Sequence, residues 1–289
     1  MLKSLLKTMR PHQWTKNVFI FTALIFDEKL FKPLPLARTM AAFVLFCLTS
    51  SAVYLINDVA DIDKDRQHPT KRLRPLASGE LKPSVAIAAA VALVGISLPL
   101  SFWLSPYFGL IALGYFLTMV AYSFVLKNVV IVDVLTVAAG FVLRVAAGAA
   151  VVEVERFSPW LYICTTFLAL FIGIGKRRHE LVVLSANASE HRQSLSEYSL
   201  PLLDEMIAVV TSATVLAWSL YTFSAPNLPP NHAMMLTIPF VLYGIFRYLY
   251  LIHVRKEGGT PEELVFKDRP LLIDIGLWGL AVVAILYLF

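Results

Sequence analysis

Four side chains in the run from Asn57 to Asp65 have the types and spacing needed to bind a metal ion. At about 100° per residue in an α-helix, these four share an arc of about 100°: Asn57, Asp58, Asp61 and Asp65. Asp63 points to the opposite side. Carboxylates gathered at the end of an apolar segment repel one another, so a cation is expected among them. Such oxygen ligands suit Mg²⁺, which proteins hold through one or two carboxylates together with substrate phosphates. The run therefore predicts a Mg²⁺-diphosphate site at a membrane surface, with Mn²⁺ as an alternative ion.

Basic residues follow the acids and offer donors to phosphate oxygens that the metal does not reach. They are Lys71, Arg72 and Arg74. A loop on the cytoplasmic side of a membrane also collects such charges, so both interpretations stay open for these three. For Asp61 and Asp65 the functional interpretation is favoured, because a topological loop does not need carboxylates on one helical face.

A second charged cluster follows the glycines at 173 and 175. Lys176 and Arg177 are candidate phosphate clamps, and Glu180 is a candidate ribose ligand or a support for the bases. The alternative is that Lys176 and Glu180, one helical turn apart, simply pair. The polar loop that follows, with Arg192 as a further candidate ligand, is expected to cap a cytoplasmic cavity.

Other candidates lie in or beside apolar segments. Arg144 sits deep in one, and an intramembrane charge normally faces the interior of a helix bundle. A cavity role is favoured for it, with a structural ion pair as the alternative. Lys16 and Asn17 precede the first apolar segment and could reach the same cavity.

Composition excludes an ordinary soluble domain. Of 289 residues, 58% are hydrophobic and only 16% are charged, and the mean hydropathy is +0.70. Apolar segments of about 20 residues, the length that crosses a bilayer, recur along the whole chain. The net charge of +5 does not indicate nucleic acid, because the basic residues flank these segments.

The apolar pattern predicts an all-α integral membrane protein, a single domain over 1–289, with nine transmembrane helices. Their predicted ranges are 17–31, 37–59, 84–104, 107–126, 129–151, 159–178, 204–225, 233–253 and 271–289. If nine helices alternate, Lys and Arg gather in the segments on one side. The other side receives Lys29, Lys32, Arg38 and Arg156. The N-terminus and the acidic run are therefore expected in the cytoplasm of a plasma (inner) membrane protein, with the C-terminus outside.

The pattern Asn57-Asp58-x-x-Asp61-x-x-x-Asp65 resembles the UbiA superfamily of intramembrane transferases. That resemblance implies nine transmembrane helices around a central cavity with cytoplasmic cap loops. Most members are prenyltransferases with a second aspartate motif after the sixth helix. This chain departs there, since it has Lys176, Arg177 and Arg178 with the single acid Glu180.

Four further motifs resemble the decaprenyl-phosphate phosphoribosyltransferase branch of the superfamily. They are Arg10-Pro11-x-Gln13-Trp14-x-Lys16-Asn17, Tyr122-Ser123-x-x-x-Lys127, Gly140-Phe141-x-x-Arg144 and Gly175-Lys176-Arg177. The resemblance implies transfer from 5-phosphoribosyl diphosphate (PRPP) to a polyprenyl phosphate, with release of diphosphate. It makes Tyr122 and Lys127 candidate substrate ligands. Bases in place of the second acidic motif suit two phosphate-bearing substrates.

The expected partners are therefore PRPP, a polyprenyl phosphate and membrane lipid, and no nucleic acid; a homo-oligomer is left open. Two other functions compete with this interpretation. One is a UbiA-type transfer of a prenyl group from a prenyl diphosphate to an aromatic acceptor. The other is an ion-coupled transporter, which is disfavoured because the acids lie at a helix end and transporter sites lie near the bilayer midplane.

Overall fold

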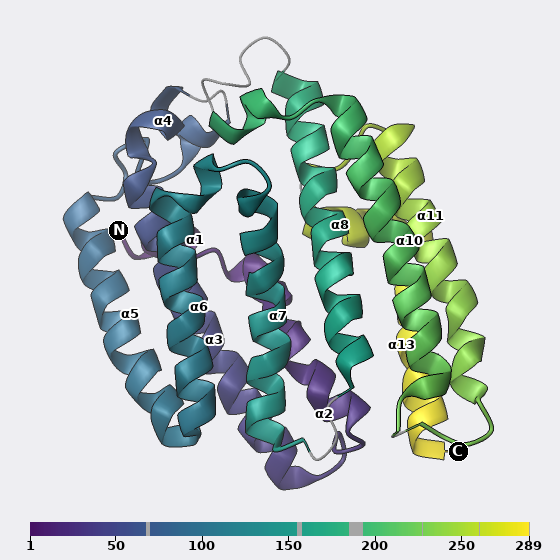
Figure 1. Cartoon of the computed structure of the whole chain (residues 1–289). Helices are drawn as coiled ribbons and strands as arrows, with labels where there is room; N and C mark the ends of the chain where they lie inside the picture. The colour runs from purple at the N-terminus through teal and green to yellow at the C-terminus, as the bar shows by residue number, and fades with distance from the viewer. Residues whose placement is uncertain (68–69, 155–157, 185–192, 227, 260, 289) are drawn as a thin grey trace. The chain divides into compact units, whose positions relative to one another are not determined.

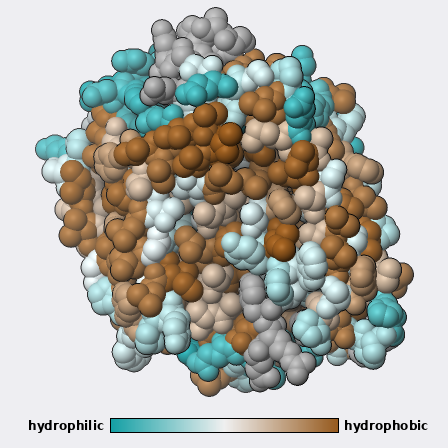
Figure 2. Space-filling model, in the orientation of Figure 1, coloured by the Kyte–Doolittle hydropathy of each residue, from teal (hydrophilic) through white to brown (hydrophobic). Residues whose placement is uncertain are grey.

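The computed structural model describes residues 1–67, 70–154, 158–184, 193–226, 228–259 and 261–288, and all regular elements among them are helical. Eight helical segments within these ranges are long and apolar enough to cross a bilayer. Seven of these are α3 (Pro33–Ala60), α5 (Pro83–Leu104), α6 (Pro106–Phe124), α7 (Val132–Val152), α8 (Pro159–Leu184), α10 (Leu200–Ser224) and α13 (Arg269–Leu288) (Figure 1). The eighth joins the 3₁₀ turn η6 (Ala233–Thr237) to α11 (Ile238–His253). Apolar residues make up much of the surface drawn in Figure 2, as lipid contact requires.

The remaining elements are short. They are α1 (Leu2–Met9), η1 (Pro11–Phe21), α2 (Thr22–Phe26), α4 (Ile62–Gln67), η2 (Lys71–Leu73), η3 (Leu126–Asn128), η5 (Gln193–Glu197) and α12 (Pro261–Lys267). Prolines stand at the first turns of α3, α5, α6 and α10, where a missing N–H removes no helical hydrogen bond.

Eight of the nine predicted helices agree with the structure to within a few residues at most ends. The largest difference among them is in α8, which continues to Leu184 beyond its predicted end at 178. The first predicted helix, 17–31, is wrong in kind. Its residues belong to the 3₁₀ segment η1 and the five-residue helix α2, which ends at Phe26.

The segment η1 runs antiparallel along α3. The Trp14 indole N–H donates to Ser51 Oγ at 3.0 Å, and further on the Phe21 and Phe43 rings lie 5.7 Å apart. At the rise of a 3₁₀-helix, about 2.0 Å per residue, η1 covers about 22 Å of the length of α3. The segment thus covers most of a hydrocarbon thickness without being an α-helix.

The chain divides into two compact units. The first, unit 1, comprises Met1–Leu24, Phe31–Thr136 and Leu143–Glu153. Within it, α3 packs against α5, α6 and η1, and α1 packs on α3. The Phe46 ring lies 4.6 Å from that of Tyr115 in its core. The acidic run belongs to this unit.

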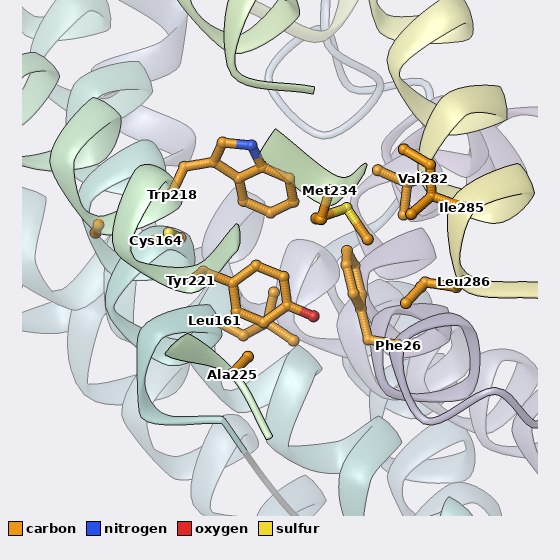
Figure 3. Packing of buried hydrophobic residues seen from close by; sticks show 11 residues of the cluster. Phe26, Leu161, Cys164, Trp218, Tyr221, Ala225, Met234, Val282, Ile285 and Leu286 are labelled. Carbon is orange, nitrogen blue, oxygen red and sulfur yellow. The ribbon is translucent and has the colours of Figure 1, made fainter. Parts of the chain in front are cut away.

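The second, unit 2, comprises Ile25–Leu30, Val137–Val142 and Val154–Phe289. Here α8 packs along α10, and α11 packs against α13. Figure 3 shows the aromatic core, in which the Trp218 and Tyr221 rings stack at 5.2 Å. The indole N–H of Trp218 donates to Thr237 Oγ1 at 3.0 Å, so this buried donor is satisfied. A single domain over 1–289 stays a prediction.

Candidate functional site

The acidic run keeps a nearly helical course across the joint between α3 and α4. The Asp61 N–H donates to the Asn57 carbonyl at 3.0 Å, and the Asp65 N–H donates to the Asp61 carbonyl at 2.8 Å. Asp58 and Asp65 are buried, whereas the Asp63 side chain is 89% exposed. The predicted difference between the two faces is therefore present in the structure.

Arg74 joins two of the acids. Its Nη1 lies 2.6 Å from Asp65 Oδ2 and 3.2 Å from Asp58 Oδ1. Because one nitrogen serves both carboxylates, the two side chains converge on a single positive centre. Arg74 follows η2 directly, so the loop after α4 brings it back onto the acids.

The third acid has a base from a distant part of the chain. Lys127 Nζ lies 2.5 Å from Asp61 Oδ1, and 66 residues separate the pair in sequence. Lys127 stands in η3, between α6 and α7, and is only 6% exposed. Removing Lys127 would leave the Asp61 carboxylate without this base.

Arg10 stands in one of the sequence motifs, was not among the predicted ligands, and lies against the acidic run. Its Nη2 lies 2.5 Å from Asp58 Oδ1, and its guanidinium lies over the Tyr54 ring at 5.1 Å. Arg10 adopts a left-handed backbone conformation, with φ of 54°, where α1 ends and η1 begins. Its place at the start of the motif containing Trp14 and Lys16 was the signal that could have identified it.

These six residues form what we call the acid–base cluster: Arg10, Asp58, Asp61, Asp65, Arg74 and Lys127. Its three carboxylates and three bases balance in charge, as buried ions must. Within the residues that the structure describes, no group of three or more His, Cys, Asp or Glu side chains could hold a metal ion alone. A metal here would have to take further ligands from a substrate or water.

Arg144 lies deep in unit 1 and contacts groups on two other elements. Its Nε donates to Asn17 Oδ1 at 2.8 Å, and its Nη2 donates to the Tyr115 hydroxyl at 2.9 Å. Asn17 in turn donates to Ser50 Oγ at 3.3 Å, so the network ties η1 to α3, α6 and α7. These contacts favour a structural role for Arg144 and Asn17 over the predicted binding of substrate.

The second predicted cluster lies on α8, inside unit 2. Arg177 pairs with Glu180. The alternative that the sequence left open was a pair between Glu180 and Lys176. Arg178 Nε lies 2.6 Å from Asp204 Oδ1 on α10. Arg192 lies outside the described residues.

Asp268 caps α13 and ties it to α11. It accepts from both Arg247 Nε and Nη2, at 3.0 and 2.7 Å, and from the Leu271 N–H at 2.9 Å. The Arg247 guanidinium, more than the backbone donor, lowers the pKa of the Asp268 carboxyl. This pair holds two membrane helices of unit 2 together at one end.

The other predicted ligands lie in unit 1 with varied exposure. Lys16, Asn57, Lys71 and Tyr122 are partly buried, and Arg72 is exposed. Their roles in binding stay predictions.

The regular elements of the described residues are all helical, and eight helical segments among them can cross a bilayer, one with paired charges at its end. Such a chain is a multi-pass membrane protein. The chain belongs to the UbiA prenyltransferase family, whose family model matches residues 18–266. It is a transferase, and the fold class that the sequence predicted is confirmed.

The chain is similar to curated relatives over nearly its whole length. It is 31% identical to the decaprenyl-phosphate phosphoribosyltransferase of Corynebacterium glutamicum, over 98% of this chain and 87% of that protein. It is 32% identical to the protein of the same name from Mycobacterium tuberculosis, over 96% of this chain and 92% of the relative.

Solved structures share the fold. A UbiA homolog from Archaeoglobus fulgidus bound to DMAPP and Mg²⁺ matches with a TM-score of 0.76, over 99% of this chain and 100% of that one. The same homolog bound to GPP and Mg²⁺ matches with a TM-score of 0.77. The sequence identities are 19% and 20%, so these structures establish the fold alone.

Proposed function

We propose that this protein transfers 5-phosphoribose from PRPP to a polyprenyl monophosphate such as decaprenyl phosphate. The bond between ribose C1 and the diphosphate oxygen breaks, and its electron pair leaves with the diphosphate. A lipid phosphate oxygen forms the new bond to C1 from the opposite face, which inverts that centre. No base is required, because a phosphate monoester with a second pKa of about 6 is largely ionised at neutral pH.

The observation that carries this proposal is the near full-length similarity to several relatives named decaprenyl-phosphate phosphoribosyltransferase. The side chains of the acid–base cluster also support the proposal. Phosphate-rich substrates need cations, and the cluster holds Arg10, Arg74 and Lys127 within reach of its acids.

The side chains present fit Mg²⁺. Asp58 and Asp65 converge on one nitrogen of Arg74, which shows that two carboxylates can address a single cation from these positions. Oxygen ligands, fewer than a full cage, match the way Mg²⁺ is bound beside phosphates. When bound, the ion would neutralise charge on the departing diphosphate.

The proposed ligands come from those that the sequence predicted, and two of the predicted residues are reassigned. The metal ligands are Asn57, Asp58, Asp61 and Asp65. Lys16, Lys71, Arg72, Arg74, Tyr122 and Lys127 are proposed to bind substrate oxygens. On α8, Lys176 and Arg177 are proposed phosphate ligands with Glu180 as their support. Asn17 and Arg144 are reassigned to hold η1 in position, because of their buried contacts. Alignment and electrostatic stabilisation then account for most of the catalysis.

The proposed orientation places the acid–base cluster at the cytoplasmic surface of the plasma membrane. The excess of Lys and Arg around the acidic run supports this, because cytoplasmic segments collect those residues. PRPP, a charged soluble metabolite, would reach the site from that side.

The test uses purified protein in lipid nanodiscs with Mg²⁺, ribose-labelled PRPP and decaprenyl phosphate. We expect label to enter the organic phase with release of one diphosphate per label, and both to stop with EDTA. A parallel reaction offers geranyl diphosphate and 4-hydroxybenzoate. Aqueous label together with prenylated aromatic product would overturn the proposal in favour of an ordinary prenyltransferase.

A further inference from the structure

Arg74 is placed where a second cation would compete with it. It lies against both Asp58 and Asp65 through the same nitrogen. Asp58 also has Arg10 against the same oxygen, at 2.5 Å. Among the described residues, the only ion pair that Asp65 makes is with Arg74. If Arg74 moved away, Asp58 would keep a base and Asp65 would present a bare carboxylate.

We propose that Arg74 holds the position of the divalent cation in the substrate-free protein and moves onto the diphosphate when the metal and the substrate bind. The inference rests on the proposed function, because it takes a metal-diphosphate as the ligand of the acid–base cluster. It assigns Arg74 a positioning role that neither the family nor the relatives' names describe.

Electrostatics makes metal binding and diphosphate binding depend on each other. A metal ion that arrives alone must displace a guanidinium from two buried carboxylates, and the displaced charge remains close to a dication. A diphosphate brings anionic oxygens that can accept the released N–H donors of Arg74. The two ligands should therefore bind with positive coupling, and the metal alone should bind weakly.

Arg74 also has the freedom for such a movement. Its side chain is 26% exposed, whereas those of Asp58 and Asp65 are 2% and 5% exposed. It stands in an extended conformation just after the three-residue turn η2, and the acids lie on the helical joint. The base is thus the more exposed partner, with room to move, and the carboxylates are the buried ones.

The test measures Mn²⁺ binding by electron paramagnetic resonance on purified protein, first with Mn²⁺ alone and then with inorganic diphosphate. In Arg74→Gln we expect Mn²⁺ alone to bind about tenfold more tightly, because its competitor is gone. Diphosphate should raise the affinity for Mn²⁺ in the original protein. In Arg74→Gln we expect this increase to be about tenfold smaller, because the diphosphate oxygens no longer have the Arg74 guanidinium to bind. A simple loss of structure would weaken both.

The matched control is Arg66→Gln. Arg66 lies on α4 beside the cluster but pairs with the exposed Asp63 at 3.3 Å, so both Mn²⁺ constants should stay at their original values. Arg74→Lys keeps the charge and should retain weak binding of Mn²⁺ alone. Unchanged or weaker Mn²⁺ binding in folded Arg74→Gln would overturn the inference. Neither Mn²⁺ measurement uses PRPP. A failure of the ribose-transfer assay would therefore count against the proposed function and not against this role of Arg74.

Discussion

Asp61, Asp63 and Asp65 are the same residue type within five positions, yet they have different surroundings. Asp65 is buried against Arg74 and Asp61 faces Lys127, whereas Asp63 is exposed. We expect Asp61→Asn and Asp65→Asn each to lower kcat/KM for PRPP by about 100-fold or more, the scale of a lost electrostatic stabiliser. Asp63→Asn should stay within about twofold of the original value.

Steady-state transfer of ribose label measures this, with melting temperatures to show that each variant is folded. Asp63→Asn is the matched control, because it removes the same charge from the same short segment at an exposed position. Comparable losses at all three positions would mean that net charge, and not the helical face, matters.

At the level of single residues, sequence predicted which acids share a face but not which base each one meets. Helical periodicity fixes the relation of Asp58 to Asp65 because both belong to one short run. Lys127 reaches Asp61 because α6, which leads into η3, packs on α3, and no local pattern encodes that contact. The same holds for Arg144, whose depth was predicted and whose contacts with Asn17 and Tyr115 were not.

Among the elements, the eight long spans were predictable and η1 was not. A long apolar segment between charged ends must cross a bilayer as a helix, because its backbone groups need internal partners. A 3₁₀ segment meets the same requirement with a similar composition, so apolarity does not distinguish it from an α-helix. The choice between them depends on tertiary contacts, which for η1 include α3 and α7.

Gly148 on α7 lies close to the backbone of η1. A Cβ built there would lie 1.9 Å from the carbonyl oxygen of Ile20. We therefore expect Gly148→Ala to push η1 away and to destabilise the protein by about 1–3 kcal/mol, as overpacking does. The loss should appear as a lower melting temperature in detergent.

Gly114→Ala on α6 is the matched control, because nothing lies within 4 Å of a Cβ there. Alanine is a better helix former than glycine by about 0.8–1 kcal/mol, so this variant should melt at the same temperature or higher. Equal destabilisation by both substitutions would show that the contact between Gly148 and Ile20 does not hold η1 in place.

For the whole molecule, the number of membrane crossings decides whether the two termini lie on the same side of the membrane. Eight helical segments that cross the membrane would leave both termini on one side. If η1 crosses the membrane as well, on its antiparallel course along α3 and into α2 before α3 begins at Pro33, the crossings number nine. Backbone hydrogen bonds in a 3₁₀ segment are internal, which makes such a crossing compatible with lipid.

We accordingly expect the N-terminus in the cytoplasm and the C-terminus outside. Alkaline phosphatase, which is active only outside the cytoplasm, should be active when fused after Ser105, between α5 and α6, and at the C-terminus. Green fluorescent protein, which fluoresces only inside, should be bright when fused at the N-terminus and after Gly79, before α5. A dim N-terminal fusion alongside the other three expected results would reduce the crossings to eight and place η1 and α2 on one side. Nine crossings therefore require a segment that is not an α-helix, and the N-terminal reporter, compared with the one after Gly79, tests that segment directly.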